Sequence, residues 1–97
     1  MLYTINKSPL SARNLDSVLR IAPAGEPILL YEDGVYAATP GSKSAPIIEA
    51  ALVDRPIYAL DADLEARGVT EVIPGVQVIG YDGFVELVEQ HDVAPWL

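Results

Sequence analysis

Four short hydrophobic runs recur along the chain, and each has the length of a buried β-strand. They occupy residues 1–5, 27–31, 56–60 and 76–79. Apolar residues are nearly continuous within each run rather than alternating with polar ones. Both faces of the predicted strands are therefore expected to be covered, as in a parallel sheet between layers of helices.

The segments between these runs carry helical patterns. In residues 12–22 the apolar positions follow the i, i+3, i+4, i+7 spacing of one helix face: Leu15, Val18, Leu19 and Ala22. Ser11 is the expected N-cap of this helix, and Pro23 and Gly25 end it.

Three further aspartates are expected to cap helices that follow a strand. Asp33 opens a helix over residues 33–38, Asp61 opens one through Arg67, and Asp82 opens the last one. A separate helical piece is expected near residues 47–52. Gly68 suits the left-handed residue that ends the helix before it. In the last helix, the residues expected to share one face are Phe84, Leu87, Val88 and His91.

Strand and helix thus alternate throughout, which predicts an α/β fold. We expect an open, mainly parallel sheet with helices on both faces, forming three layers with right-handed crossovers. A chain of 97 residues is too short for two independent cores, so residues 1–97 are expected to form one domain.

Hydrophobic residues make up 51% of the chain, which is rich for a small protein. A partner-binding surface and a sheet covered on both faces explain this composition equally well.

The formal net charge of −8 disfavours direct binding of nucleic acids or anionic membrane surfaces. The acidic excess lies mostly in residues 51–97, which carry two basic and nine acidic side chains. This acidic part could attract a basic partner or merely keep the surface solvated.

The chain contains no cysteine, so it supplies no thiolate for disulfides, metal binding or sulfur transfer. We expect no metal and no cofactor. Residues 1–10 show no signal-peptide pattern, and no apolar stretch approaches the length of a membrane span, so we expect a cytoplasmic protein without membrane contact.

Loops after the strands are where an open α/β sheet usually places its ligand site. The sequence has neither a GxGxxG nor a Walker A pattern. Ser8 beside Lys7 fits a polar turn better than a nucleophile with its base, and Glu32 beside Asp33 fits capping better than a cation or shared-proton site. The lone His91 is expected to pack in its helix rather than bind a metal. We therefore assign no catalytic residue.

Three aromatic residues are candidates for contact with another subunit: Tyr36, Phe84 and Trp96. Trp96 follows Pro95 near the end of the sequence, where a chain usually has few neighbours to bury an indole. Contact with a partner and packing on its own domain are both open for this residue.

Several blocks of the sequence resemble one family in order. Residues 1–9 read MLYTINKSP and residues 29–38 read LLYEDGVYAA. Later blocks are Tyr58-Ala59-Leu60, DLEARG at 63–68, YDGFV at 81–85 and a tryptophan near the C-terminus. Together they resemble the DsrH/TusB family, which implies a DsrE/DsrF/DsrH-like fold.

The resemblance implies a non-catalytic subunit of a heterohexameric sulfur-relay complex. Such a complex contains three related types of subunit, with two copies of each. A cysteine of a TusC/TusD-like or DsrE/DsrF-like partner would carry the persulfide toward a downstream sulfur carrier. The TusBCD form of the complex serves 2-thiouridine formation at the tRNA wobble position, and the DsrEFH form serves dissimilatory sulfur oxidation.

DsrH-type members commonly have a cysteine in the first helix, where this sequence reads DSVLR at residues 16–20. That departure favours the TusB-like role over the oxidative one. Two alternatives stay open, namely a DsrH-type subunit of sulfur oxidation and a self-associating module that binds a small anion at the strand ends.

Overall fold

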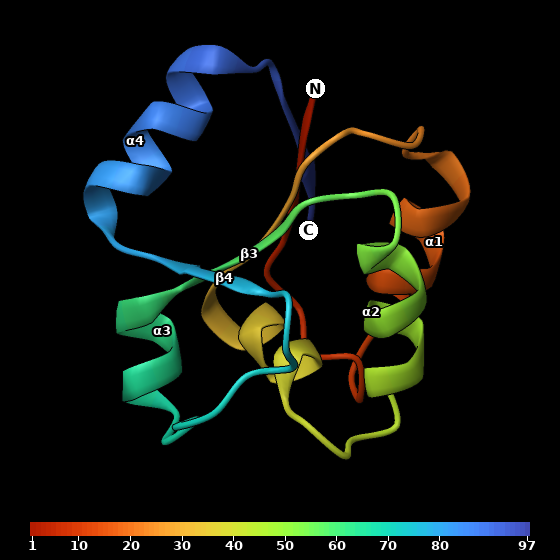
Figure 1. Ribbon diagram of the computed structural model, residues 1–97, viewed down its shortest axis with the longest axis vertical. Helices are drawn as coiled ribbons and strands as arrows, with labels where there is room; N and C mark the ends of the chain where they lie inside the picture. Colours follow the sequence, from red (N-terminus) through yellow and green to blue (C-terminus); the bar gives the residue numbers. More distant parts are fainter.

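The computed structural model describes all residues from Met1 to Leu97. Along the chain the elements are β1 (Leu2–Ile5), α1 (Asn14–Ile21), β2 (Ile28–Leu30), the 3-10 helix η1 (Glu32–Ala38), α2 (Ala45–Leu52), β3 (Ile57–Leu60), α3 (Asp61–Ala66), β4 (Gln77–Ile79), α4 (Tyr81–Gln90) and β5 (Val93–Trp96). Figure 1 shows them in sequence colours. The alternation of strand and helix predicted by the hydrophobic runs is confirmed.

The five strands form one sheet in the order β4-β3-β2-β1-β5. All four pairings are parallel, so the open α/β architecture is confirmed. The sheet contains one strand more than the four hydrophobic runs predicted, because the residues of β5 alternate between exposed and partly buried positions and form no hydrophobic run. This strand pairs only with β1, so it lies at the edge of the sheet. Its sequence includes Pro95, which has no backbone N–H to donate, and an edge strand tolerates such a residue because one of its sides has no neighbouring strand.

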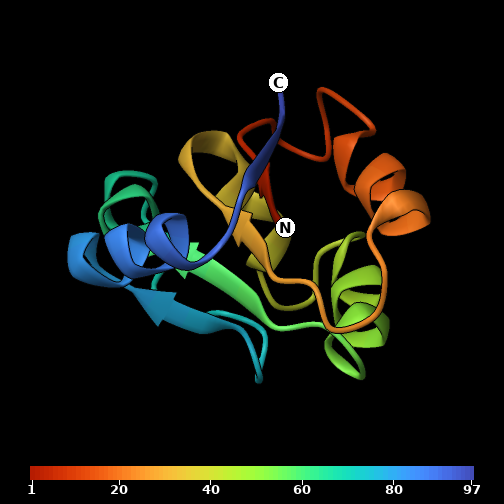
Figure 2. The same cartoon turned by 90° about the horizontal axis from the view of Figure 1, so that it is seen from above.

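The two faces of the sheet are covered unequally. On one face, a core of 18 buried residues joins the sheet to α1, η1, α2 and α3. On the other face, a small core contains only three buried residues, Leu2, Leu29 and Leu87, of which Leu87 belongs to α4. Figures 1 and 2 show α1 and α2 together on one side of the strands and α4 on the other. The helical cover of the second face is therefore thin.

The aspartates predicted as N-caps do not cap their helices. The residues at these N-cap positions are Tyr31 for η1, Leu60 for α3 and Gly80 for α4, and no side chain caps any of them. Ser11 is also not a cap, because α1 begins after Arg13 and the Ser11 hydroxyl donates to the carbonyl of Ser8. The carboxylates instead lie inside the first turns, where they still face the positive end of the backbone dipoles.

The face predicted for α4 is only partly correct. Phe84 and Leu87 pack toward the sheet, but Val88 is 38% exposed and His91 lies beyond the last helical residue. Val88 faces away from the sheet although it lies four residues after Phe84. The buried face of the helix is therefore narrower than the apolar spacing predicted.

Two glycines have backbone roles that their neighbours make clear. Gly68 has φ +68°, which confirms the left-handed residue expected after α3. Gly34 is buried where η1 approaches β1, and a Cβ there would collide with the Ile5 carbonyl group. The Ile5 carbonyl oxygen also accepts the Tyr31 N–H at 3.1 Å, so the turn after β2 lies directly on the end of β1.

None of the helices has the length and hydrophobicity that a membrane-spanning helix requires.

Candidate functional site at the carboxyl edge of the sheet

The turns after β2 and β3 are joined by an unusual backbone arrangement. Glu32 has φ +48°, a left-handed conformation that side chains rarely adopt. Its N–H donates to Asp63 Oδ2 at 2.7 Å, so the first turn of α3 holds the strained residue in place. The two carboxyl-edge turns thus form one connected unit.

Arg67 completes this connection. Its Nε donates to Asp33 Oδ1 at 2.8 Å, and its Nη1 donates to the carbonyl of Asp63 at 3.2 Å. The hydrogen bond to the Asp33 carboxylate raises the pKa of Arg67 above its ordinary value. Asp33 is therefore an ion-pair partner of α3 rather than the helix cap that the sequence predicted.

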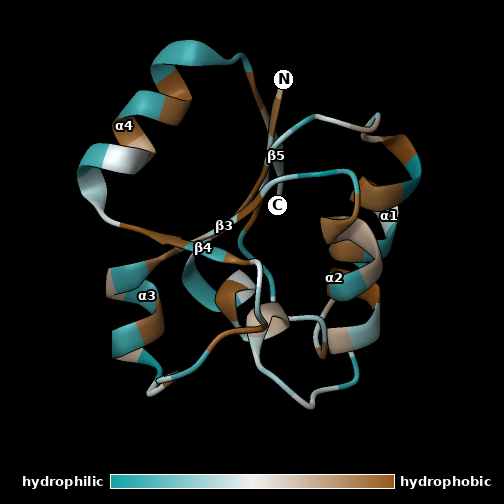
Figure 3. Cartoon of the chain, in the orientation of Figure 1, coloured by the Kyte–Doolittle hydropathy of each residue, from teal (hydrophilic) through white to brown (hydrophobic).

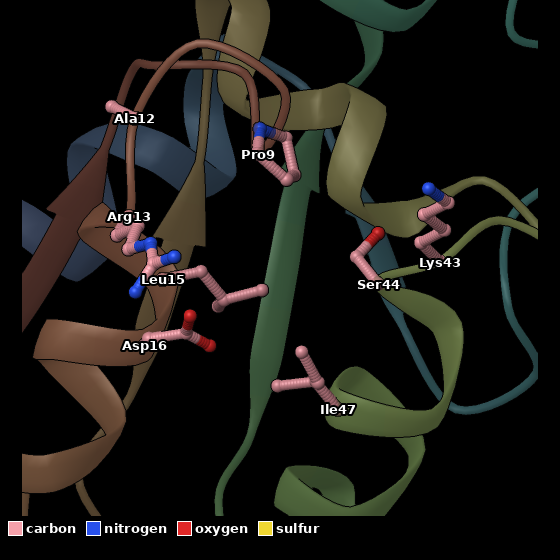
Figure 4. Close-up of a pocket in the computed structure, with 8 residues that line it drawn as sticks. All are labelled: Pro9, Ala12, Arg13, Leu15, Asp16, Lys43, Ser44 and Ile47. Carbon is pink, nitrogen blue, oxygen red and sulfur yellow. The ribbon is translucent and has the colours of Figure 1, made fainter.

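A cavity of about 350 Å³ lies between the start of α1 and the start of α2. Figure 4 shows Arg13 and Asp16 on the α1 side and Lys43, Ser44 and Ile47 on the α2 side. The lining residues are Pro9, Ala12, Arg13, Leu15, Asp16, Lys43, Ser44 and Ile47. The two basic side chains have no carboxylate within salt-bridge distance, although Asp16 shares the cavity wall.

A second cavity of about 380 Å³ shares Pro9, Lys43 and Ser44 with the first. Its wall includes Tyr36, one of the residues predicted to contact a partner, which is 40% exposed. The two hollows together form a depression on the same side of the sheet as the larger core, bordered by the loops after β1 and η1.

The depression offers charge and shape but no paired nucleophile and base. The Ser44 hydroxyl is buried and donates to the Ala37 carbonyl at 3.1 Å. The Ser8 hydroxyl accepts the Leu10 N–H at 3.2 Å, which agrees with the polar turn expected at Lys7 and Ser8. No group of three His, Cys, Asp or Glu residues is placed to hold a metal ion.

The segment DSVLR at residues 16–20 of helix α1 contains two different environments. Asp16 lines the cavity, whereas Val18 is fully buried in the larger core. A thiol at position 16 would meet solvent, and a thiol at position 18 would be packed among apolar side chains. In this chain neither position has one.

The three predicted contact residues lie in three different places. Tyr36 borders the depression on η1, Phe84 packs on the smaller core from α4, and Trp96 packs on the larger core from β5. The Trp96 and Tyr3 ring centroids are 5.9 Å apart, so the indole does dock on its own chain. Their role in partner contact stays a prediction.

Sequence reasoning missed the cavity residues Arg13, Asp16 and Lys43. About thirty residues of sequence separate Lys43 from Arg13 and Asp16. These side chains come together only because the two crossovers place α1 and α2 on the same face of the sheet. The runs of polar residues before α1 and α2 were the available signal, but they resemble ordinary loops.

Comparison with known proteins identifies the family. The family model described as "DsrH like protein" matches residues 7–94. The chain is 44% identical to Protein TusB of Serratia proteamaculans over 92 residues, covering 94% of each chain. It is 43% identical to Protein TusB of Erwinia tasmaniensis over 90 residues, covering 90% of each.

Solved structures agree on the fold. The ychN protein from E. coli superposes with a TM-score of 0.79 at 15% identity, covering 98% of this chain and 97% of that one. Protein MTH1491 from Methanobacterium thermoautotrophicum gives a TM-score of 0.73 at 16% identity, covering 98% and 96%. At these identities the structures support the fold alone, and the sequence matches show that the chain belongs to the DsrH-like family.

Proposed function

We propose that this chain is a non-catalytic subunit of a sulfur-relay complex and holds a cysteine-bearing related subunit in its transfer geometry. The observation that carries this proposal is the match, over nearly the full length of both chains, to proteins named TusB. A persulfide relay needs a thiolate at each transfer step. These 97 residues supply none, so the relay cysteine must belong to another subunit.

The geometry of the molecule agrees with a positioning role. The carboxyl-edge turns are tied together by Glu32, Asp63 and Arg67, and the neighbouring depression is lined with charged side chains but lacks a nucleophile with its base. A charged edge whose turns are hydrogen-bonded to each other can orient a partner without taking part in its chemistry. We place the complex in the cytoplasm, with TusC/TusD-like partners and a downstream sulfur carrier.

Within this role we propose the tRNA pathway, in which the relayed sulfur reaches 2-thiouridine at the wobble position. The similarity to TusB proteins, at 44% identity for the Serratia proteamaculans protein, favours this pathway over sulfur oxidation. The net charge of −8 implies that the chain acts upstream of tRNA contact.

Deletion of the gene in its native cell tests the proposal. The partner cysteine stays chemically intact but is poorly aligned, so wobble 2-thiouridine should fall when tRNA nucleosides are quantified. Growth on reduced sulfur compounds is measured in parallel. Normal thiouridine together with failed sulfur oxidation would reject the tRNA pathway and favour the DsrH-type role.

A further inference from the structure

Helix α4 carries an apolar stripe that the chain covers only in part, because Val85 is half-buried and the other two residues of the stripe are exposed. Tyr81, Val85 and Val88 follow one another at i, i+4 and i+7, so they lie along one side of the helix. Tyr81 is 75% exposed and Val88 is 38% exposed. We call these three residues the α4 stripe.

The α4 stripe lies beside the thin core of the second sheet face. Only Leu87 of α4 is buried, and Phe84 packs against the same three-residue core. Figure 2 shows α4 apart from α1 and α2, which cover the other face, and Figure 3 shows hydrophobic segments on α4 between hydrophilic ones. An apolar surface next to an incompletely covered sheet face is typical of a protein contact.

Carboxylates border this stripe, and residues 80–93 contain no lysine or arginine. Asp82, Glu86, Glu89 and Asp92 are all exposed, and none of them forms an ion pair within the chain. At 100° per residue, Asp82 and Glu89 lie next to Val85 on the side of α4 opposite the buried Leu87, whereas Glu86 lies further round the helix. The surface therefore has an apolar strip with an acidic rim along one side.

We propose that the α4 stripe binds a different subunit, one that presents an apolar patch edged by lysine or arginine side chains. This inference rests on the proposed function and names the surface through which the chain would hold its partner. A second copy fits poorly, because a symmetric α4 contact would bring two acidic rims together on molecules that each carry a net charge of −8. A basic-rimmed partner instead gains both apolar burial and charge complementarity.

The test measures binding to the related TusC/TusD-like subunits of the same organism, produced together and purified. The apolar variant is Tyr81→Ser with Val88→Ser, and the charge variant is Asp82→Lys with Glu89→Lys. The apolar control is Val53→Ser, at a side chain that is 87% exposed after α2, and the charge control is Glu49→Lys with Glu65→Lys, at exposed carboxylates of α2 and α3.

Each α4 variant should weaken binding by about tenfold or more, whereas the controls should stay within about twofold of wild type. Wild-type binding should also weaken when salt is raised from about 50 to about 500 mM, a measurement that needs no variant. A thermal unfolding scan of every variant confirms that the fold is retained.

The results distinguish a wrong assignment of the α4 surface from a wrong proposed function. Wild-type binding that neither the variants nor salt changes would overturn the assignment of α4 and leave the scaffold role intact. Failure of wild type to bind any related subunit would overturn the scaffold role itself. Loss of only a homo-oligomer in the α4 variants would show that a second copy, not a basic-rimmed partner, occupies the stripe.

Discussion

Trp96 lies against Tyr3, with ring centroids 5.9 Å apart and ring planes inclined at 55°. The contact joins the last strand of the chain to the first, because β5 pairs in parallel with β1 and aligns Trp96 with Ile5. The C-terminal segment is thereby part of the larger core rather than a free tail.

This contact predicts that Trp96→Ala lowers the free energy of unfolding by about 2 kcal/mol, since it removes partly buried aromatic surface and the ring pair. Trp96→Phe should recover most of the loss. Urea unfolding of the purified chain measures both, with Leu97→Ala as the control at a side chain that is 76% exposed. A Trp96→Ala variant as stable as the control would mean that β5 does not dock in solution.

The close approach of η1 to β1 predicts that Gly34→Ala is strongly destabilising. A Cβ at this position would lie 2.9 Å from the Ile5 carbonyl carbon and closer still to its oxygen, so the backbone must move. We expect a loss of about 3 kcal/mol in the free energy of unfolding.

The matched control for this glycine is Gly41→Ala. Gly41 has φ +73° but no atom within 4 Å of the added Cβ, so only backbone strain of about 1 kcal/mol is expected. Equal losses at the two positions, measured by chemical unfolding, would show that the contact with Ile5 is not tight.

Cysteine substitutions in α1 should differ in thiol reactivity. Val18→Cys places the thiol in the larger core, where burial keeps it protonated and out of reach, whereas Asp16→Cys places it on the cavity wall. With a persulfide donor, intact mass should show added sulfur on Asp16→Cys only. Wild type, which has no thiol, is the negative control. Sulfur added to wild type, or to Val18→Cys as fast as to Asp16→Cys, would contradict this prediction.

The sequence predicts those parts of the fold that depend on local patterns. The runs at residues 1–5 and 27–31 identify two strands, the spacing of Leu15 and Val18 identifies α1, and Gly68 marks the end of α3. The hydrophobic pattern does not predict strand β5, because its four residues alternate between exposed and partly buried positions and include Pro95, which is rare in strands.

The candidate site was less accessible to sequence reasoning, because it depends on contacts between distant segments. Asp33 was expected to cap its own helix, yet its carboxylate pairs with Arg67, 34 residues away. Arg13 and Lys43 line the same cavity because two crossovers place α1 and α2 on one face of the sheet. Local propensity carries no information about either pairing.

The scaffold role is tested by the native mass of the assembly that contains this chain, purified gently from its native cell. We expect a heteromer with two copies each of this chain and two related subunits, in which only partner chains gain persulfide sulfur from a donor. A monomer, or a homo-oligomer without any related subunit, would contradict it.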